Sequence, residues 1–395
     1  MESSDIINYD YIICGGGMSG LSLAYHLSNS KLSDKKILII EPETKNQNDR
    51  TWAFWEQGTN PFDEILAANW QNIFITDSSG VKKKIPLKSY AYKLIRGIDF
   101  YEFVNAHLAK FPNITFKKDR VLDILDLNSS VTVKTEKGNF KALHVFDSTF
   151  KLDINNPKNI NLLQHFKGYV VKSDKEVFDL NTPDMMDFSI PQKSHEGRFM
   201  YILPLSKNKA LVEFTVFSER LLEQNTYTNE LECFLTERYP NIIFEIEEEE
   251  FGVIPMSDVA TAEFPSKNVS RIGTAAGYTN PATGYTFANT QRKLLAIVQK
   301  LEKGKLPSEK QVSWFEKRHE LYASTLLYVI AEDLYPMSES FKRIFNKNDI
   351  ESVFRFLDQK SSLWDEIKIM WSTPKLIFGK AFLLVVFKKL KGAFL

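Results

Sequence analysis

The chain has 395 residues, of which 43% are hydrophobic, so it can bury a sizeable core, and its length suggests two or three structural units. Fifty basic and fifty acidic residues give a formal net charge of zero, so no global field favours nucleic acid as a partner. Cys14 and Cys233 are the only cysteines and lie far apart, which excludes a disulfide framework and paired zinc ligands, and we expect no metal site.

The first residues, MESSDIINYD, lack the basic and apolar pattern of a signal peptide. No run approaches the roughly 18 apolar residues of a membrane-spanning helix. We therefore expect a cytoplasmic protein, or one attached to the cytoplasmic side of a membrane without crossing it.

Residues 9–27, YDYIICGGGMSGLSLAYHL, have the order of a dinucleotide site: an apolar strand, a glycine-rich turn and a helix. A second strand, KKILIIEP, ends at an acidic residue, at about the offset from which a carboxylate binds a ribose hydroxyl. We predict nucleotide binding by Gly15, Gly17, Met18, Ser19, Gly20 and Glu41, with Arg50 near Glu41 or the adenosine.

Residues 268–301 predict a short strand, a second glycine-rich loop and a long helix that starts near residues 283–285. A late loop of this kind resembles FAD enzymes of the glutathione-reductase type, where it approaches the flavin, although an ordinary loop before a helix has the same pattern. Thr274 stands where many relatives place an aspartate. The expected flavin-binding residues are Gly273, Thr274, Gly277, Thr283, Gly284 and Tyr285.

Strand patterns between residues 160 and 250 indicate an antiparallel sheet, and the pattern after residue 310 is helical. We predict an α/β fold: a Rossmann-like FAD-binding domain of glutathione-reductase type, an antiparallel substrate-binding sheet and a helical C-terminal region. Its segments are 1–80, 100–160 and 251–310 for the FAD domain, 81–99 and 161–250 for the sheet domain, and 311–395 for the helices.

One strand, LVEFTVF at residues 211–217, carries a carboxylate among large hydrophobic residues. Alternation places Glu213 with Leu211, Thr215 and Phe217 on one side. Glu213 then faces either water or a site where its charge is costly. The nearby acidic run 247–250 predicts a solvated turn.

The segment 376–391 places seven apolar residues, 381–387, between lysines. This composition suits a helix in the interface of an anionic membrane, and it equally suits a core helix with a solvated basic end.

Four motifs together resemble the FAD-dependent lycopene cyclases of carotenoid-making bacteria: DRTWAFW at 49–55, LPLSKNKALVEFTVFS at 203–218, FGVIPM at 251–256 and IGTAAGYTNPATGYTFANT at 272–290. The likeness extends to DIESVFRFLDQKSSLWDEIKIMWSTP near the end of the chain. This family shares the threonine at position 274.

The resemblance implies a lycopene β-cyclase, an isomerase of the intramolecular lyase type. Lycopene, or another acyclic carotenoid, is protonated at C2, the C1 cation is attacked by the C5–C6 double bond, and loss of the C6 proton leaves a β-ionone ring, giving γ-carotene and then β-carotene. The family uses reduced FAD, with NAD(P)H as electron donor, although the reaction involves no net redox change.

The resemblance assigns the essential acid to Glu213, and apolar surroundings would keep that carboxyl protonated. The sequence leaves open whether this carboxyl or the reduced flavin itself protonates the alkene. We further expect Trp52, Trp55, Phe214, Tyr278 and Asp187 to contribute to substrate binding, although each could be an ordinary core or sheet residue. A substrate that dissolves in bilayers favours the membrane role of 376–391. Alternatives are a flavin monooxygenase or isoprenoid reductase on the same fold, or a non-enzymatic isoprenoid-binding protein.

Overall fold

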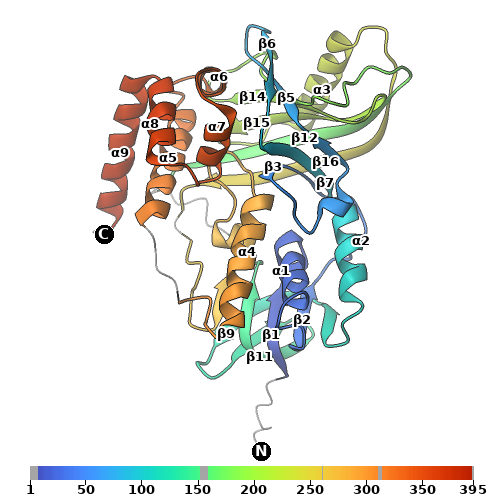
Figure 1. Cartoon of the computed structure of the whole chain (residues 1–395), viewed down its shortest axis with the longest axis vertical. Helices are drawn as coiled ribbons and strands as arrows, with labels where there is room; N and C mark the ends of the chain where they lie inside the picture. The colour runs from blue at the N-terminus through green and yellow to red at the C-terminus, as the bar shows by residue number, and fades with distance from the viewer. Residues whose placement is uncertain (1–7, 152–158, 260, 310–313, 394–395) are drawn as a thin grey trace, which may run out of the picture.

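The computed structural model describes residues 8–151, 159–259, 261–309 and 314–393, which form three β-sheets and a set of C-terminal helices. In Figure 1 the first sheet lies at the end of the molecule that carries the N-terminus, and the second sheet lies at the opposite end. The C-terminal helices, drawn in red, pack at one side of the second sheet. This arrangement agrees with the predicted α/β architecture.

The first sheet has its strands in the order β8-β2-β1-β11-β10-β9, with β17 beside β11. Strand β1 runs parallel to both β2 and β11, as in a dinucleotide-binding fold. Ile12 and Ile13 are fully buried in clusters on opposite faces, which is why this strand reads as a continuous apolar run. The strands are β1 (Tyr9–Cys14), β2 (Ile37–Glu41), β8 (Ile114–Lys118), β9 (Val121–Asp126), β10 (Val131–Thr135), β11 (Gly138–Asp147) and β17 (Val269–Arg271).

One face of this sheet is covered by helices α1 (Met18–Ser28), α2 (Gly97–Leu108) and α4 (Phe287–Glu302). Helix α4 begins at Phe287, two to four residues later than the sequence predicts. The loop that follows the 3-10 turn η2 (Gly273–Ala276) continues to the N-cap residue Thr286 and occupies the difference. A second 3-10 turn, η1, spans Asp63–Ile65.

The second sheet has the order β16-β12-β15-β14-β13-β5-β6, and the strands from β16 to β13 pair antiparallel. Helix α3 (Gln224–Arg238) covers one face, while the C-terminal helices pack with the other. Strand β5 belongs to this sheet although it lies within the segment 1–80. The strands are β5 (Asn72–Thr76), β6 (Lys82–Pro86), β12 (Asn161–Ser173), β13 (Asp184–Asp187), β14 (Gly197–Ser206), β15 (Lys209–Ser218) and β16 (Phe244–Ser257).

A small third sheet joins the two larger units through strands β3 (Thr51–Gln57), β4 (Ala68–Trp70) and β7 (Tyr90–Arg96). Strand β3 carries most of the DRTWAFW motif. One of its aromatic residues, Phe54, packs in the core cluster of the first sheet, and Trp55 packs in that of the second. The motif therefore ties both units together.

The C-terminal region confirms the predicted helical character. Asp349 caps α7 by accepting a hydrogen bond from Glu351 N, and Ser362 and Asp365 form a capping box at the start of α8. No helix within the described ranges has the length and hydropathy needed to cross a bilayer. The helices are α5 (Trp314–Ala331), α6 (Met337–Lys347), α7 (Ile350–Leu357), α8 (Leu363–Ser372) and α9 (Lys375–Ala393).

Candidate active site

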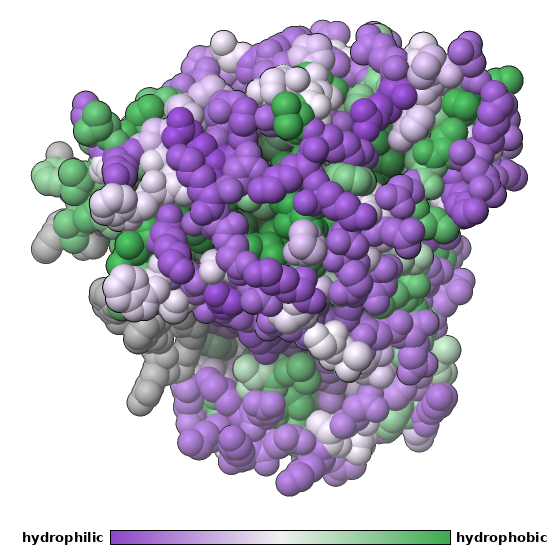
Figure 2. Space-filling model, turned by 45° about the horizontal axis from the view of Figure 1, so that its top comes forward, coloured by the Kyte–Doolittle hydropathy of each residue, from purple (hydrophilic) through white to green (hydrophobic). Residues whose placement is uncertain are grey.

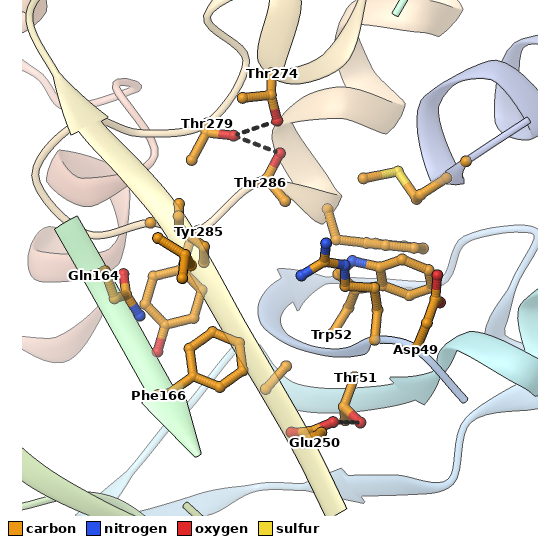
Figure 3. Close-up of a pocket in the computed structure, with 18 of the residues that line it drawn as sticks. Asp49, Thr51, Trp52, Gln164, Phe166, Glu250, Thr274, Thr279, Tyr285 and Thr286 are labelled. Atoms are coloured by element: carbon orange, nitrogen blue, oxygen red, sulfur yellow. Dashed lines mark hydrogen bonds between the residues drawn. The ribbon is translucent and has the colours of Figure 1, made fainter. Parts of the chain in front are cut away.

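A cavity of about 480 Å³ opens where the glycine-rich turn after β1, the DRTWAFW motif, the second sheet and the loop before α4 meet. Figure 3 shows Gln164 and Phe166 projecting into it from β12, with Trp52 and Asp49 on the opposite side. Predicted site residues that line it are Gly17, Met18, Ser19, Arg50, Trp52, Glu213, Thr274, Thr283, Gly284 and Tyr285. The four sequence motifs therefore converge on one space.

The glycine-rich turn has the shape that a dinucleotide requires. Gly15 adopts a φ of +99°, and a Cβ on Gly20 would lie 2.0 Å from the carbonyl oxygen of Gly15, so helix α1 packs too closely for a side chain there. The space over Gly17 is open to 4 Å. A pyrophosphate can therefore approach the backbone at Gly17.

Glu41 contacts the glycine-rich turn itself. Its carboxylate accepts a 2.6 Å hydrogen bond from the backbone N–H of Gly16 and a second from Glu43 N at 3.1 Å. The acid at the end of β2 thus holds the turn, and its predicted bond to a ribose hydroxyl is a proposal for the cofactor complex.

The loop before α4 presents a row of hydroxyl groups to the cavity. Thr279 lies 3.3 Å from the hydroxyl of Thr274 and donates a 3.2 Å hydrogen bond to that of Thr286 (Figure 3). Thr283 Oγ1 and Gln164 Oε1 are buried and have no hydrogen-bond partner within the described part of the chain. Unpartnered buried polar atoms on a cavity wall suit a polar ligand such as a ribityl chain or flavin ring.

Glu213 projects from β15 into the cavity and accepts a 2.6 Å hydrogen bond from Thr215 on the same face of the strand. Burial raises the pKa of the Glu213 carboxyl well above its ordinary value, and the nearby Glu250 raises it further, whereas the Thr215 hydrogen bond lowers it. A carboxyl in this setting keeps its proton to a higher pH than an exposed glutamate does, as an acid catalyst requires.

Glu250 is a cavity residue that the sequence did not indicate. It lies on β16 and accepts a 2.8 Å hydrogen bond from the hydroxyl of Thr51 (Figure 3). Burial raises its pKa, opposed by the hydrogen bonds of Thr51 and Glu213 and by the charge of Arg50. The one available signal was its place directly before FGVIPM.

The solvated turn predicted for residues 247–250 is wrong, because these residues lie within β16, where successive side chains face opposite sides. Glu247 pairs with Lys209 at 2.6 Å, Glu248 with Arg96 at 2.8 Å and Glu249 with Lys167 at 3.3 Å. Glu250 alone of the four lines the cavity.

A tyrosine cluster lies beside Glu213, formed by Tyr92, Tyr201 and Tyr285 from three different segments. The hydroxyl groups of Tyr201 and Tyr285 are 3.3 Å apart. Burial raises the pKa of Tyr285 to about 12, with the nearby hydroxyl groups of Tyr201 and Tyr92 opposing this shift and the charge of Glu213 adding to it. All three phenols therefore stay neutral and present their aromatic rings to the cavity.

Trp52 provides an aromatic wall, with its ring centroid 5.8 Å from that of Phe287. Trp55 lies behind the cavity, stacked on Phe354 at 4.6 Å and donating a hydrogen bond to Asp358 at 2.8 Å. The ring of Trp55 contacts Tyr285, so Trp55 packs behind a residue that lines the cavity.

Three predicted substrate residues lie elsewhere. Phe214 is buried on the opposite face of β15 near Tyr227, Tyr278 is buried in the core of the first unit with its hydroxyl on Glu263, and Asp187 is buried in β13 beside Ser189. None of these three residues lines the cavity. Gly273 and Gly277 have φ values of +67° and +72° and shape the loop from outside the cavity.

No group of three or more His, Cys, Asp or Glu side chains suited to a metal ion occurs among the residues that the structure describes.

Solved structures with a similar fold are flavoproteins and related enzymes. They include a geranylgeranyl bacteriochlorophyll reductase-like protein from Thermoplasma acidophilum (TM-score 0.58, 15% identity, covering 96% of this chain and 95% of that one). A flavoprotein/dehydrogenase from Cytophaga hutchinsonii has a TM-score of 0.59 and 12% sequence identity, and the match covers 96% of this chain and 99% of that one. Halogenase PltM in complex with phloroglucinol and FAD has a TM-score of 0.53 and 12% sequence identity, and the match covers 89% of this chain and 82% of that one. The fold is therefore that of FAD-dependent flavoproteins.

Curated relatives are carotenoid enzymes of plants. Capsanthin/capsorubin synthase of Citrus sinensis is 25% identical over 315 residues, covering 73% of this chain and 59% of that protein. Neoxanthin synthase of Solanum tuberosum is 24% identical over 320 residues, which cover 75% of this chain and 61% of that protein. The chain thus matches about three-fifths of the length of these relatives. The sequence profile of the lycopene cyclase protein family matches residues 10–381, and the chain belongs to this family.

Proposed function

We propose that this chain is a lycopene β-cyclase that converts the acyclic ends of lycopene into β-ionone rings with reduced FAD bound. The observation that carries the proposal is Glu213, a carboxyl with a raised pKa at the wall of an aromatic-lined cavity that also contains the glycine-rich turn. Protonation of an unactivated alkene needs an aimed acid in a site that excludes water.

The residues present fit FAD. The open backbone at Gly17, the neighbouring Ser19 and the hydroxyl row before α4 would hold its pyrophosphate and ribityl groups, with Arg50 near the adenosine side. The bound reduced cofactor would supply negative charge close to a developing carbocation. NAD(P)H is the proposed electron donor that keeps the cofactor reduced.

Glu213 would donate its proton to C2 of a terminal isoprenoid unit, forming the C–H bond as the O–H bond breaks. The C5–C6 double bond then attacks C1, and loss of the C6 proton to a carboxylate of the site completes the β ring. Trp52 and the tyrosine cluster would bind the polyene and offer aromatic faces to the cation. Protons and electrons balance, so lycopene and product are isomers.

Helices α8 and α9 expose a hydrophobic surface that would contact the membrane from which lycopene is taken. Trp364 is 74% exposed, Trp371 67% and Leu383 67%, and the nitrogen of Lys375 lies 3.6 Å from the ring centroid of Trp371. Figure 2 shows apolar groups on the left of the molecule, the side on which α9 lies in Figure 1. The exposed apolar residues are Leu363, Trp364, Ile367, Met370, Trp371, Leu376, Leu383, Leu384, Phe387 and Leu390.

Exposed lysines on the same two helices, Lys368, Lys375, Lys380 and Lys388, would reach anionic head groups. Meanwhile Ala381 and Val385, one turn apart, are buried against the protein. Helix α9 thus combines the two alternatives raised by its sequence: a packed inner face and an apolar outer face. The proposed location is peripheral, on the cytoplasmic side of the membrane.

Expression in a lycopene-accumulating bacterium tests the activity. We expect new cyclic carotenes with the wild-type chain and persistent lycopene with Glu213→Gln, while bound FAD stays unchanged in the variant. Reduced or hydroxylated carotenoids instead of cyclic isomers would indicate a reductase or monooxygenase. Unchanged lycopene with the folded, FAD-loaded wild-type protein would refute the cyclase proposal.

A further inference from the structure

Gly168 on β12 lies between the two cavity carboxyls. In the antiparallel register it is paired with Glu213 on one neighbouring strand, β15, and with Glu250 on the other, β16. Residues directly opposite one another in a sheet have side chains on the same face. Glu213 and Glu250 therefore project from the same face of the sheet, separated by one position that has no side chain.

The side chain of Glu250 leans over this glycine. A Cβ at Gly168 would lie 3.0 Å from Glu250 Cγ, 3.2 Å from Glu250 Oε1 and 3.0 Å from Leu211 Cδ1. These distances are tighter than ordinary contacts, so any side chain at this position would displace Glu250 or Leu211. The glycine thus leaves the space in which Glu250 approaches Glu213.

Each carboxyl has one hydroxyl donor of its own, Thr215 for Glu213 and Thr51 for Glu250. Neither carboxyl forms a salt bridge within 4.0 Å in the described part of the chain, although the charge of Arg50 acts on Glu250. Two carboxylates without a paired cation in a buried site repel each other strongly.

We propose that Glu213 and Glu250 form a carboxyl pair that shares one proton across Gly168, and that Glu250 is the positioning residue that keeps this proton on Glu213. The inference rests on the proposed cyclase function for its chemical use, but the pair itself can be tested without substrate.

The electrostatics of the site agree with the pair. Burial is the largest cause that raises the pKa of each carboxyl. For Glu213 the negative charge of Glu250 raises the pKa further. The hydrogen bond from Thr215 lowers the pKa of Glu213, and the interaction with the Glu250 side chain raises it. The other groups facing the pair are Tyr92, Tyr201 and Tyr285, whose pKa values are raised, together with Arg50 and Glu248. Arg50 and Thr51 both favour the charged form of Glu250, so the proton resides on Glu213.

The pair closes the proton balance of the reaction. Glu213 loses its proton to C2, which leaves two carboxylates beside the cation. The proton that leaves C6 then goes to one of these two carboxylates. Transfer between the two carboxyls then restores protonated Glu213. The pair therefore needs no net uptake of protons, and its carboxyl proton exchanges with the solvent between turnovers.

Infrared spectroscopy of the purified holoenzyme tests the pair without lycopene. A buried protonated carboxyl gives a C=O stretching band whose loss can be followed as pH rises. We expect Glu250→Gln to shift this loss to lower pH, because the neighbouring negative charge is removed, and Gly168→Ala to shift it in the same direction by displacing Glu250. Glu249→Gln, on the same strand but paired with Lys167, is the matched control and should titrate like the wild type.

Cyclisation by the same proteins supplies the second readout. We expect Glu250→Gln to lose about tenfold or more of kcat at neutral pH and to recover activity as pH falls. If both Glu250→Gln and Gly168→Ala titrate at the wild-type pH, the shared proton is refuted. If Glu250→Gln fails to fold, Gly168→Ala decides alone. Shifted bands in a protein that never cyclises lycopene would support the pair and refute the cyclase function.

Discussion

The hydroxyl of Thr51 donates a 2.8 Å hydrogen bond to Glu250, joining the DRTWAFW motif to a strand 199 positions later in the sequence. This bond anchors one carboxyl of the cavity from the small third sheet. Because the Thr51 hydrogen bond lowers the pKa of Glu250, it also favours a proton on Glu213.

Replacement of Thr51 by valine removes this hydrogen bond at nearly constant volume. The pKa of Glu250 should rise, and we expect kcat for cyclisation to fall about tenfold, equivalent to about 1.4 kcal/mol, with FAD binding unchanged. Thr236→Val is the control, since that hydroxyl bonds only its own helix, at Glu232 O. Wild-type turnover in Thr51→Val would contradict the proposed role of this bond.

Two glycines of the first turn should respond differently to substitution. Gly17→Val adds a side chain in open space, so we expect a stable protein whose FAD affinity falls at least about tenfold. Gly20→Ala instead places Cβ 2.0 Å from Gly15 O and should lower the free energy of unfolding by about 2 kcal/mol. Flavin fluorescence and denaturant unfolding measure the two effects. Equal FAD affinity in wild type and Gly17→Val would place the cofactor elsewhere.

Arg318 and Glu366 form a buried ion pair between α5 and α8, with three donor–acceptor distances of 2.8 to 3.0 Å. Although burial opposes it, the hydrogen bonds from Arg318, Tyr322 and Ser361 lower the pKa of Glu366 below its ordinary value of 4.5. The pair's contribution is therefore present above pH 4.5 and is lost as pH falls through the lower folded-state pKa.

We expect Glu366→Gln to lower the free energy of unfolding by about 3 kcal/mol at neutral pH, because it leaves a buried arginine without its partner charge. Denaturant titrations across pH measure this loss and should show a smaller acid dependence than in the wild type. Glu176→Gln breaks an exposed pair with Lys207 and should leave stability unchanged. Equal stability of Glu366→Gln and wild type would show that this pair contributes nothing.

The membrane surface can be tested by removing its apolar side chains. The triple variant Leu383→Ser, Leu384→Ser and Phe387→Ser should reduce sedimentation with anionic vesicles at least about tenfold, since each buried side chain contributes about 1.5 kcal/mol or more. The matched control Val81→Ser, Leu180→Ser and Ile243→Ser removes exposed apolar residues elsewhere. Equal losses in both variants would refute α9 as the docking element.

Sequence patterns predicted the units of this fold because each has a strong local signal. The apolar run of β1 followed by glycines defines a parallel strand and turn, and the alternation in β12, β14 and β15 defines an antiparallel sheet. The family motifs then indicated the cavity, since DRTWAFW and the loop before α4 both line it.

Residues whose roles depend on pairing between distant strands could not be predicted in this way. Strand alternation itself places Phe214 opposite Glu213, so both could not face one cavity. Glu250 resembles its acidic neighbours in sequence, and only the register that brings β16 beside Gly168 distinguishes it. The acidic run 247–250 has a composition typical of a solvated turn, yet it belongs to strand β16, where three of its four carboxylates pair with basic side chains.

The most direct measurement of the central claim is the mass of the product formed in heavy water. Purified, FAD-loaded protein is reduced and supplied with lycopene in vesicles prepared in D₂O, with Glu213→Gln as the control. Acid-initiated cyclisation predicts a cyclic carotene that carries one deuterium per ring and no other change in composition, and no product from the variant. A product that has gained two hydrogens or an oxygen, or an equal yield from Glu213→Gln, would contradict the account.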